Sequence, residues 1–241
     1  MSVCAVIPAA GRGTRLGGNG PKILTPLTDS RTIWSVLYDR LTPLVNHIHL
    51  VLSPEGASVF PALPANVSTS IQPAPTGMGD AIFRGYDIWS RHDAVLVVWG
   101  DQVFVSADTL SRSLAALVPG RNAVLPVTRM TAPYVEYVFS GAALTKVLQT
   151  REGDVTRPGG FSDVGTFALG TDGLKPAWEA YRATSPRGGA TGEINFLPFL
   201  PFLATQGWRI TPLEVADATE ARGINTPDDL AFFRSLYKTA P

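Results

Sequence analysis

The sequence is poor in several features that define specialised protein classes. Its 241 residues include a single cysteine, Cys4, so no disulfide can form within the chain and a cytosolic setting is expected. No apolar run reaches the length that spans a bilayer, and the first residues lack the basic start and long apolar core of a signal peptide. We therefore expect a cytoplasmic protein without a membrane partner.

An excess of charge of one sign is also absent. Lys and Arg together number 20, as do Asp and Glu, which gives a formal net charge of zero. General nucleic-acid binders carry a basic excess, so nucleic acid is not an expected partner. Hydrophobic residues make up 45% of the chain and charged residues 17%, which is a balance typical of globular proteins. The composition therefore leaves a small-molecule enzyme or binding protein as the main possibilities.

Short apolar runs alternate with helical patterns over the first half of the sequence. The pattern predicts strands at Val3–Pro8, His47–Leu52, Val67–Gln72, Ala94–Trp99 and Ala123–Thr128, with helices at Thr32–Leu44, Met78–Trp89 and Thr109–Leu117. Such alternation is typical of βαβ units, in which a mostly parallel sheet carries helices on both faces.

The pattern changes after Val127. Three runs read as strands joined by turns, and they are followed by two helices, a strand and a closing helix: Tyr134–Phe139, Leu144–Gln149, Asp163–Leu169, Leu174–Tyr181, Ile194–Thr205, Arg209–Glu214 and Pro227–Tyr237. Consecutive strands predict an antiparallel insertion or extension of the sheet. No linker divides the chain, so we expect one α/β domain over residues 1–241.

The strongest functional signal follows the first predicted strand. There the chain reads Pro8-Ala9-Ala10-Gly11-Arg12-Gly13-Thr14-Arg15-Leu16, and Pro21-Lys22 comes shortly after. Two glycines let the backbone turn sharply and approach a ligand, and the exposed amides of such a loop suit phosphate. Arg15 and Lys22 add positive charge. The segment predicts a polyphosphate cradle; the alternative is a plain strand-to-helix turn with two solvated basic residues.

Two common phosphate loops do not fit this segment. The dinucleotide fingerprint requires glycine where the chain has Leu16. The P-loop requires Gly-Lys-Ser/Thr, whereas Lys22 stands between Pro21 and Ile23.

The sequence Gly-x-Gly-Thr-Arg followed by Pro-Lys resembles the signature of nucleotidyltransferases that make sugar nucleotides. The spacing from Arg15 to Lys22 is most similar to that in the uridylyltransferase domain of the bifunctional N-acetylglucosamine-1-phosphate uridyltransferases. The resemblance covers nearly the whole chain. It implies a Rossmann-like, GT-A-like fold with a nucleotide-binding part at about residues 1–130 and an acceptor-binding part at about 131–225.

A second segment, Gln72-Pro73-Ala74-Pro75-Thr76-Gly77-Met78-Gly79-Asp80-Ala81, matches the family's base-recognition segment in spacing, with Met78 and Asp80 at the places of Thr and His. A Gln amide offers both donors and acceptors to a pyrimidine edge; the alternative is a surface turn that caps the next helix. The resemblance implies a nucleotide-binding set of Ala9, Ala10, Gly11, Gly13, Thr14, Gln72, Gly77, Met78 and Gly100.

Two further segments supply metal ligands by resemblance. Asp101 ends a very apolar predicted strand, where ligands bind in open α/β sheets, and it matches the family's magnesium-binding aspartate. Asn225, in Gly223-Ile224-Asn225-Thr226-Pro227, matches the second magnesium ligand, and its carbonyl oxygen suits a hard cation. Helix capping is the alternative for both, although Asp108 and Thr226 are better placed for it.

The acceptor half departs from the family pattern. Tyr134-Val135-Glu136 aligns with Tyr-Gly-Arg, Gln149 with a carboxylate that touches the sugar, and Asp163 with an Asn. Glu193 matches a Gly-Glu pair and could equally be an N-terminal helix charge. These alignments predict acceptor contacts from Tyr134, Glu136, Gln149, Asp163 and Glu193. They also predict that N-acetylglucosamine-1-phosphate is a poor acceptor.

The resemblance implies a magnesium-dependent transfer of a nucleoside monophosphate, from a nucleoside triphosphate to a phosphorylated small molecule, with release of pyrophosphate. Arg15, Lys22 and Asp101 are the expected catalytic residues, and a pyrimidine nucleotide is the expected donor. Two alternatives stay open. One is a cytidylyltransferase for a choline-, polyol- or phosphonate-type acceptor, and the other is a non-catalytic nucleotide sensor.

Overall fold

The computed structural model describes residues 1–241 except 12, 14–15, 17–19, 186, 191 and 239–241. The strands are β1 (Val3–Pro8), β2 (His47–Leu52), β3 (Val67–Ile71), β4 (Ala94–Val98), β5 (Asn122–Met130), β6 (Val135–Ser140), β7 (Ala143–Gln149), β8 (Gly160–Asp163), β9 (Thr166–Gly170) and β10 (Arg209–Glu214). The α-helices are α1 (Ile33–Leu41), α2 (Pro54–Val59), α3 (Met78–Arg84), α4 (Tyr86–Trp89), α5 (Ala107–Ala115), α6 (Leu174–Thr184), α7 (Phe199–Thr205) and α8 (Pro227–Lys238).

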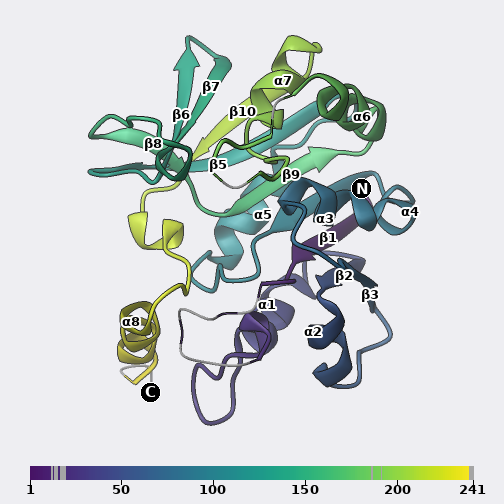
Figure 1. Ribbon diagram of the computed structural model, residues 1–241, viewed down its shortest axis with the longest axis vertical. Coiled ribbons are helices and arrows are strands. Elements are labelled where there is room, and N and C mark those ends of the chain that lie inside the picture. Colours follow the sequence, from purple (N-terminus) through teal and green to yellow (C-terminus); the bar gives the residue numbers. More distant parts are fainter. Residues whose placement is uncertain (12, 14–15, 17–19, 186, 191, 239–241) are drawn as a thin grey trace.

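All of these strands belong to one mixed sheet with the order β3-β2-β1-β4-β9-β5-β8-β6-β7, and β10 pairs with β5 (Figure 1). Pairing is parallel among β1 to β4 and between β10 and β5. It is antiparallel wherever β9, β8, β6 or β7 takes part. The prediction of a mostly parallel α/β sheet with an antiparallel extension is therefore confirmed.

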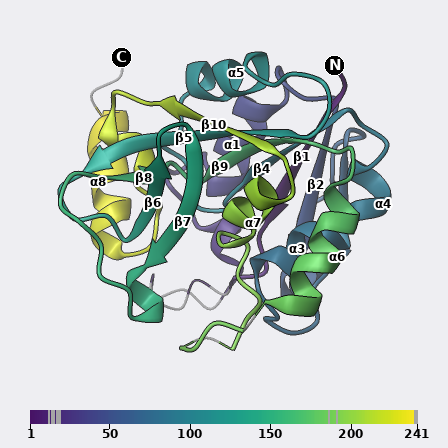
Figure 2. The same cartoon turned by 90° about the horizontal axis from the view of Figure 1, so that it is seen from above.

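Helices cover both faces of the sheet because the central strands are apolar on both sides (Figure 2). In β1, Val3, Ala5 and Ile7 belong to one buried cluster together with side chains of α1, α5 and α8. Cys4 and Val6 belong to the other, with side chains of α3, α4, α6 and α7. Among the described residues, no helix is both long and apolar enough to cross a membrane.

Three predicted elements differ from the structure by a division or a late start, and the ends of the others differ by at most three residues. The predicted helix Met78–Trp89 is divided at Gly85 into α3 and α4. The predicted strand Asp163–Leu169 is divided by Gly165, whose φ of 72° suits glycine, into β8 and β9. The predicted helix Ile194–Thr205 begins only at Phe199, directly after Pro198, because a proline is tolerated at a helix start but not in its interior.

One short helix, α2, was not predicted. Its start carries a recognisable signal, because the Ser53 side chain accepts a hydrogen bond from the Gly56 amide at 3.0 Å and Pro54 occupies the first turn. The sequence therefore carries a helix-start signal for α2, although the helix is only six residues long.

His49 of β2 is a buried polar residue whose partners are both serines of β3. Its Nδ1 lies 2.8 Å from Ser68 Oγ and its Nε2 lies 3.0 Å from Ser70 Oγ. A Cβ at Gly85 would lie 2.6 Å from His49 Cδ2, so the α3–α4 junction packs directly on the ring. Burial, followed by the charge of His47, lowers the pKa of His49 to about 4. The fold therefore holds this imidazole neutral.

This burial predicts an acid-sensitive fold. Below pH ~6.5 the unfolded chain protonates His49 whereas the folded chain does not, so the free energy of unfolding should fall by up to about 3 kcal/mol between pH ~6.5 and ~4. Urea titrations at several pH values measure this dependence. His49→Gln should flatten the slope, and His47→Gln, which removes a less buried ring, should change it less. If His49→Gln kept the wild-type pH dependence of the free energy of unfolding, the acid sensitivity would not come from His49.

Candidate active site

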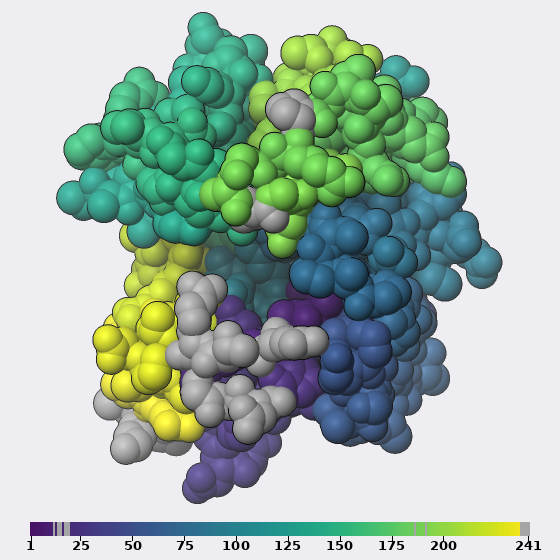
Figure 3. All heavy atoms as spheres, in the orientation of Figure 1, coloured from purple at the N-terminus to yellow at the C-terminus, as the bar shows by residue number. Residues whose placement is uncertain are grey.

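A cleft of about 490 Å³ opens where β1, β3 and β4 end. Its wall combines segments that are far apart in the sequence: Pro8–Gly11, Lys22 and Ile23, then Gln72, Pro75, Gly77, Met78 and Ala81 after β3, Trp99–Asp101, and the single residues Arg151, Glu193 and Asn225. Figure 3 shows this side of the molecule hollowed between the green segments above and the purple and blue segments below. The carboxyl ends of parallel strands are the usual ligand site of an open α/β sheet.

The loop after β1 returns to the strand end. The Lys22 amide donates to the Gly11 carbonyl at 3.0 Å. Gly13 has φ 64°, and a Cβ there would lie 3.2 Å from the Lys22 backbone, so a larger residue would push the two passes of the loop apart. Gly100 packs closely on the end of β1, because a Cβ added there would lie 2.9 Å from the Pro8 carbonyl oxygen. Glycine at these positions brings Lys22 and Asp101 to the same point.

The Lys22 ammonium lies between two side-chain oxygens. Nζ is 2.6 Å from Asp101 Oδ2 and 2.9 Å from Asn225 Oδ1. The Ile224 amide donates to the Asp101 carbonyl at 3.0 Å, and this hydrogen bond holds the Asn225 segment against the end of β4. The structure thus brings together three residues that the sequence predicted in one site.

Asn225 is positioned by the start of α8. Its amide donates to Asp229 Oδ2 at 2.9 Å, and the Thr226 amide donates to the same oxygen at 2.8 Å. The Asp229 amide in turn donates to Thr226 Oγ1 at 3.2 Å, which completes a reciprocal capping box. Thr226 therefore caps the helix while the Asn225 side chain stays free to face Asp101.

The oxygens of Asp101 and Asn225 fit a hard divalent cation. A carboxylate and an amide carbonyl are the donor types that Mg²⁺ takes from proteins, and nucleotide phosphates and water normally complete its shell. Among the described residues there is no group of three or more His, Cys, Asp or Glu that could hold a metal. The pair therefore suits an ion that arrives with a phosphate ligand better than a permanently bound one.

The segment from Gln72 to Ala81, which the sequence assigns to the base, contributes another part of the wall. Gln72 follows β3, is buried, and lines the cleft with Gly77 and Met78. Gly77 has φ 117°, and a Cβ there would lie 2.7 Å from the Ile194 carbonyl oxygen. A Cβ at Gly79 would overlap the Trp178 ring. The turn is thus pressed between the cleft and the second half of the chain.

Most residues of the predicted nucleotide, catalytic and metal sets line the cleft: Ala9, Ala10, Gly11, Lys22, Gln72, Gly77, Met78, Gly100, Asp101 and Asn225. Gly13 contacts Lys22 from behind. Thr14 and Arg15 lie outside the described residues, so their predicted contacts with phosphate stay predictions.

Of the predicted acceptor residues, the structure brings only Glu193 to the cleft. Glu136 is fully buried, and its Oε1 lies 2.6 Å from Arg157 Nη2. Asp163 accepts hydrogen bonds from Tyr137 Oη at 3.0 Å and from the Gly165 amide at 2.7 Å, so its carboxylate already has partners. Burial raises the pKa of Asp163, hydrogen bonds from Gly165 and Tyr137 oppose that shift, and the charge of Asp101 adds to it.

The remaining two acceptor predictions are placed similarly. Gln149 is buried at the end of β7, and Tyr134 is exposed beside the start of β6. Neither is among the residues that line the cleft in the described part of the chain. The geometry therefore gives no support to direct acceptor contacts from Tyr134, Glu136, Gln149 or Asp163.

Arg151 is a cleft residue that the motifs did not indicate. It lies in a short 3-10 helix after β7, and its Nη2 is 2.9 Å from Asn195 Oδ1 and 3.4 Å from Glu193 Oε2. Its buried Nε lies 3.4 Å from Glu152 Oε1 without hydrogen-bond geometry. The only sequence signal was its place two residues after Gln149, in a segment already assigned to the acceptor.

The sequence is similar to those of curated proteins over nearly its whole length. It is 29% identical over 242 aligned positions to the bifunctional protein GlmU from two strains of Acidithiobacillus ferrooxidans. The alignment covers 97% of this chain and 51% of each relative, so the chain spans about half the length of the curated relatives it matches.

Solved structures share the fold. A protein of Bacillus anthracis described as a glucose-1-phosphate thymidylyltransferase superposes with a TM-score of 0.76 at 15% identity, covering 100% of this chain and 97% of that one. The 4-diphosphocytidyl-2C-methyl-D-erythritol synthase of Anaerococcus prevotii superposes with a TM-score of 0.69 at 15% identity, covering 98% of both chains. The model of the MobA-like NTP transferase domain matches residues 5–160, which is more than half of the chain, and this protein belongs to that family.

Proposed function

We propose that this protein transfers a nucleoside monophosphate from a nucleoside triphosphate to a phosphorylated small molecule and releases pyrophosphate. The observation that carries the proposal is the Lys22 ammonium set between Asp101 Oδ2 at 2.6 Å and Asn225 Oδ1 at 2.9 Å, at the end of the cleft-forming strands. Two oxygens that fit a divalent cation and a lysine ammonium beside them suit chemistry on a polyphosphate.

The described cleft wall contains no Ser, Thr, Cys or His side chain, so it offers no conventional nucleophile–base pair. The proposed reaction needs none. An acceptor phosphate oxygen, already anionic, forms the new bond to the α-phosphorus while the bond from the α-phosphorus to the bridging oxygen breaks and pyrophosphate leaves. Catalysis is then positioning and charge neutralisation.

We assign Mg²⁺ to Asp101 and Asn225. When bound, the ion supplies Lewis-acid stabilisation of charge on the phosphates. Lys22 holds the two oxygens together in the free protein, and its flexible stem lets the ammonium turn to the α-phosphate or the acceptor phosphate. The amides of Gly11 and its neighbours, with Arg15, hold the leaving pyrophosphate in this proposal. Gln72 and the turn at Gly77 take the base, and a pyrimidine is favoured.

The acceptor occupies the end of the cleft nearest Arg151 and Glu193 in this proposal. Arg151 presents a planar fork of donors, which matches phosphate oxygens better than a lysine does. The fold neighbours described as a thymidylyltransferase for glucose-1-phosphate and a diphosphocytidyl-methylerythritol synthase both have names that imply a phosphorylated acceptor. A sugar-1-phosphate or a similar small phosphate is the acceptor class we favour.

Pyrophosphate release tests this function. Each common nucleoside triphosphate is incubated with Mg²⁺ and a panel of sugar-1-phosphates, polyol phosphates and amine-bearing phosphates. We expect acceptor-dependent release of pyrophosphate, and Asp101→Ala should lower the rate by about 10²–10³-fold or more because a positioned charge is lost. Asp108→Ala, which removes an exposed carboxylate of α5, is the matched control. Nucleotide binding without release for any acceptor would instead support a sensor.

Arg151 is expected to act on the acceptor and not on the nucleotide. Arg151→Met should raise the KM for the best acceptor by about tenfold or more, the effect of losing a charged hydrogen bond, and Arg151→Lys should recover part of it. The Kd of the nucleoside triphosphate, measured without acceptor, should stay near the wild-type value. Arg112→Met is the control, since that residue lies on the exposed face of α5. If the variant bound the nucleotide more weakly and kept the acceptor KM unchanged, Arg151 would contact the nucleotide and not the acceptor.

A further inference from the structure

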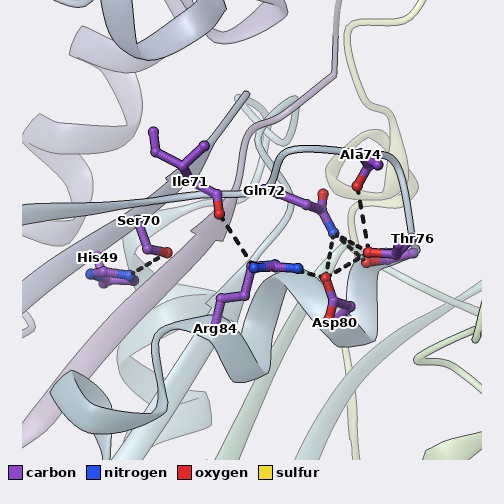
Figure 4. Close-up of polar contacts among 9 residues, drawn as sticks. His49, Ser70, Ile71, Gln72, Ala74, Thr76, Asp80 and Arg84 are labelled. Atoms are coloured by element: carbon purple, nitrogen blue, oxygen red, sulfur yellow. Dashed lines mark hydrogen bonds and ion pairs between the residues drawn. The ribbon is translucent and has the colours of Figure 1, made fainter. Parts of the chain in front are cut away.

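The side-chain amide of Gln72, a residue that lines the cleft, is held by a network of hydrogen-bond acceptors. Its Nε2 lies 3.0 Å from the Gly77 carbonyl oxygen, 3.1 Å from Asp80 Oδ2 and 3.2 Å from Thr76 Oγ1. Figure 4 shows these contacts gathered on one side of the amide, with the amide oxygen turned the other way. No described residue donates a hydrogen bond to that oxygen, Oε1.

The network permits only one orientation of this amide. A backbone carbonyl and a carboxylate are acceptors only, so rotating the amide by 180° would set Oε1 against two acceptor oxygens, which repel it. The Gly77 carbonyl would keep the Ala81 amide as a donor, and Asp80 Oδ2 would keep Thr76 and Arg84, but both hydrogen bonds from the Gln72 amide would be lost. The amide nitrogen must therefore face Gly77 and Asp80, and Oε1 is the atom available to a ligand.

Asp80 contributes a carboxylate to this network. Its Oδ2 also accepts from Thr76 Oγ1 at 2.6 Å and from Arg84 Nε at 2.8 Å. Partial burial alone would raise the pKa of Asp80, but hydrogen bonds from Thr76, Gln72 and Arg84 together with the charge of Arg84 hold it below its usual value. Asp80 is therefore ionised at neutral pH and is a permanent acceptor for Gln72.

We propose that Asp80 is a positioning residue that turns the Gln72 oxygen toward the base and so selects a nucleobase with a ring N–H on its pairing edge. Uracil and thymine carry this donor at N3 and guanine carries it at N1, whereas cytosine and adenine present a ring-nitrogen acceptor at the corresponding atom. Oxygen facing a ring acceptor leaves both unpaired, which disfavours CTP and ATP. This inference rests on the proposed nucleotide site.

The direct measurement is nucleotide affinity without acceptor, by isothermal titration calorimetry in Mg²⁺. UTP and CTP form the decisive pair because they differ only at N3 and C4 of the base. We expect the wild type to bind UTP at least about tenfold more tightly than CTP, which corresponds to about 1.4 kcal/mol. GTP against ATP should show a preference of the same sign.

Variants separate positioning from a merely structural role. Asp80→Ala should lower the UTP-over-CTP preference to about threefold or less, because only Gly77 then opposes rotation of the amide. Asp80→Asn keeps an oxygen in place of Oδ2 and should retain most of the preference. Gln72→Met should abolish it. Asp108→Ala, which breaks the equivalent i, i+4 contact with Arg112 on α5, should change neither the ratio nor the affinity.

The results distinguish the orientation of the Gln72 oxygen, the role of Asp80 and the proposed function. If the wild type binds CTP as tightly as UTP, or more tightly, the oxygen accepts from an exocyclic amino group or does not face the base, and the inference is wrong while the nucleotide site stands. An unchanged ratio in Asp80→Ala would remove Asp80 from the recognition of the base. If the wild type binds none of the nucleoside triphosphates, the proposed function fails and this inference fails with it.

Discussion

The contact of one ammonium with two oxygens determines the arrangement of the site. Lys22 Nζ joins Asp101 and Asn225, which lie 79 and 203 residues further along the chain. Asp101 follows the apolar strand β4, Asn225 precedes α8, and the partly buried ammonium gives both oxygens a donor. The contact couples the loop after β1, the end of β4 and the start of α8, and we propose that a metal and a nucleotide take it over.

A second constraint joins the two halves of the chain. The turn that carries Gly77 and Gly79 is pressed against Ile194 and Trp178 so closely that a Cβ at either glycine has no room. Through this packing, Gln72 and Glu193 both line the same cleft. The proposed contacts with the base in the first half and with the acceptor in the second half would therefore share one tightly packed seam, although their residues are far apart in the sequence.

Local patterns predicted the fold well, and most residues that the sequence assigned to the nucleotide line one cleft. The bounds of β1, β2 and β10 agree with the sequence pattern because period and burial are local properties. Asp101 and Asn225 could be placed together because each lies in a short motif that resembles a metal-binding segment of one family.

The acceptor side could not be predicted from the sequence in this way. Whether Glu136 faces a ligand or Arg157, and whether Asp163 faces a ligand or Tyr137, depends on how β6 and β8 pair, which no motif records. Arg151 reaches the cleft from a short 3-10 helix without a motif of its own. The division of the predicted helix at Gly85 likewise depends on a contact with His49 in a distant strand.

We propose that the oxygens of Asp101 and Asn225 receive the metal of a metal–nucleotide complex and release Lys22 to the phosphates. A crystal structure with Mn²⁺ and a non-hydrolysable nucleoside triphosphate tests it directly through the anomalous signal of the metal. We predict an anomalous peak at about 2 Å from both Asp101 and Asn225 oxygens, within the range for a small hard cation, with the Lys22 ammonium moved onto a phosphate. A metal–nucleotide complex bound elsewhere, with Lys22 still between the two oxygens, would contradict the account.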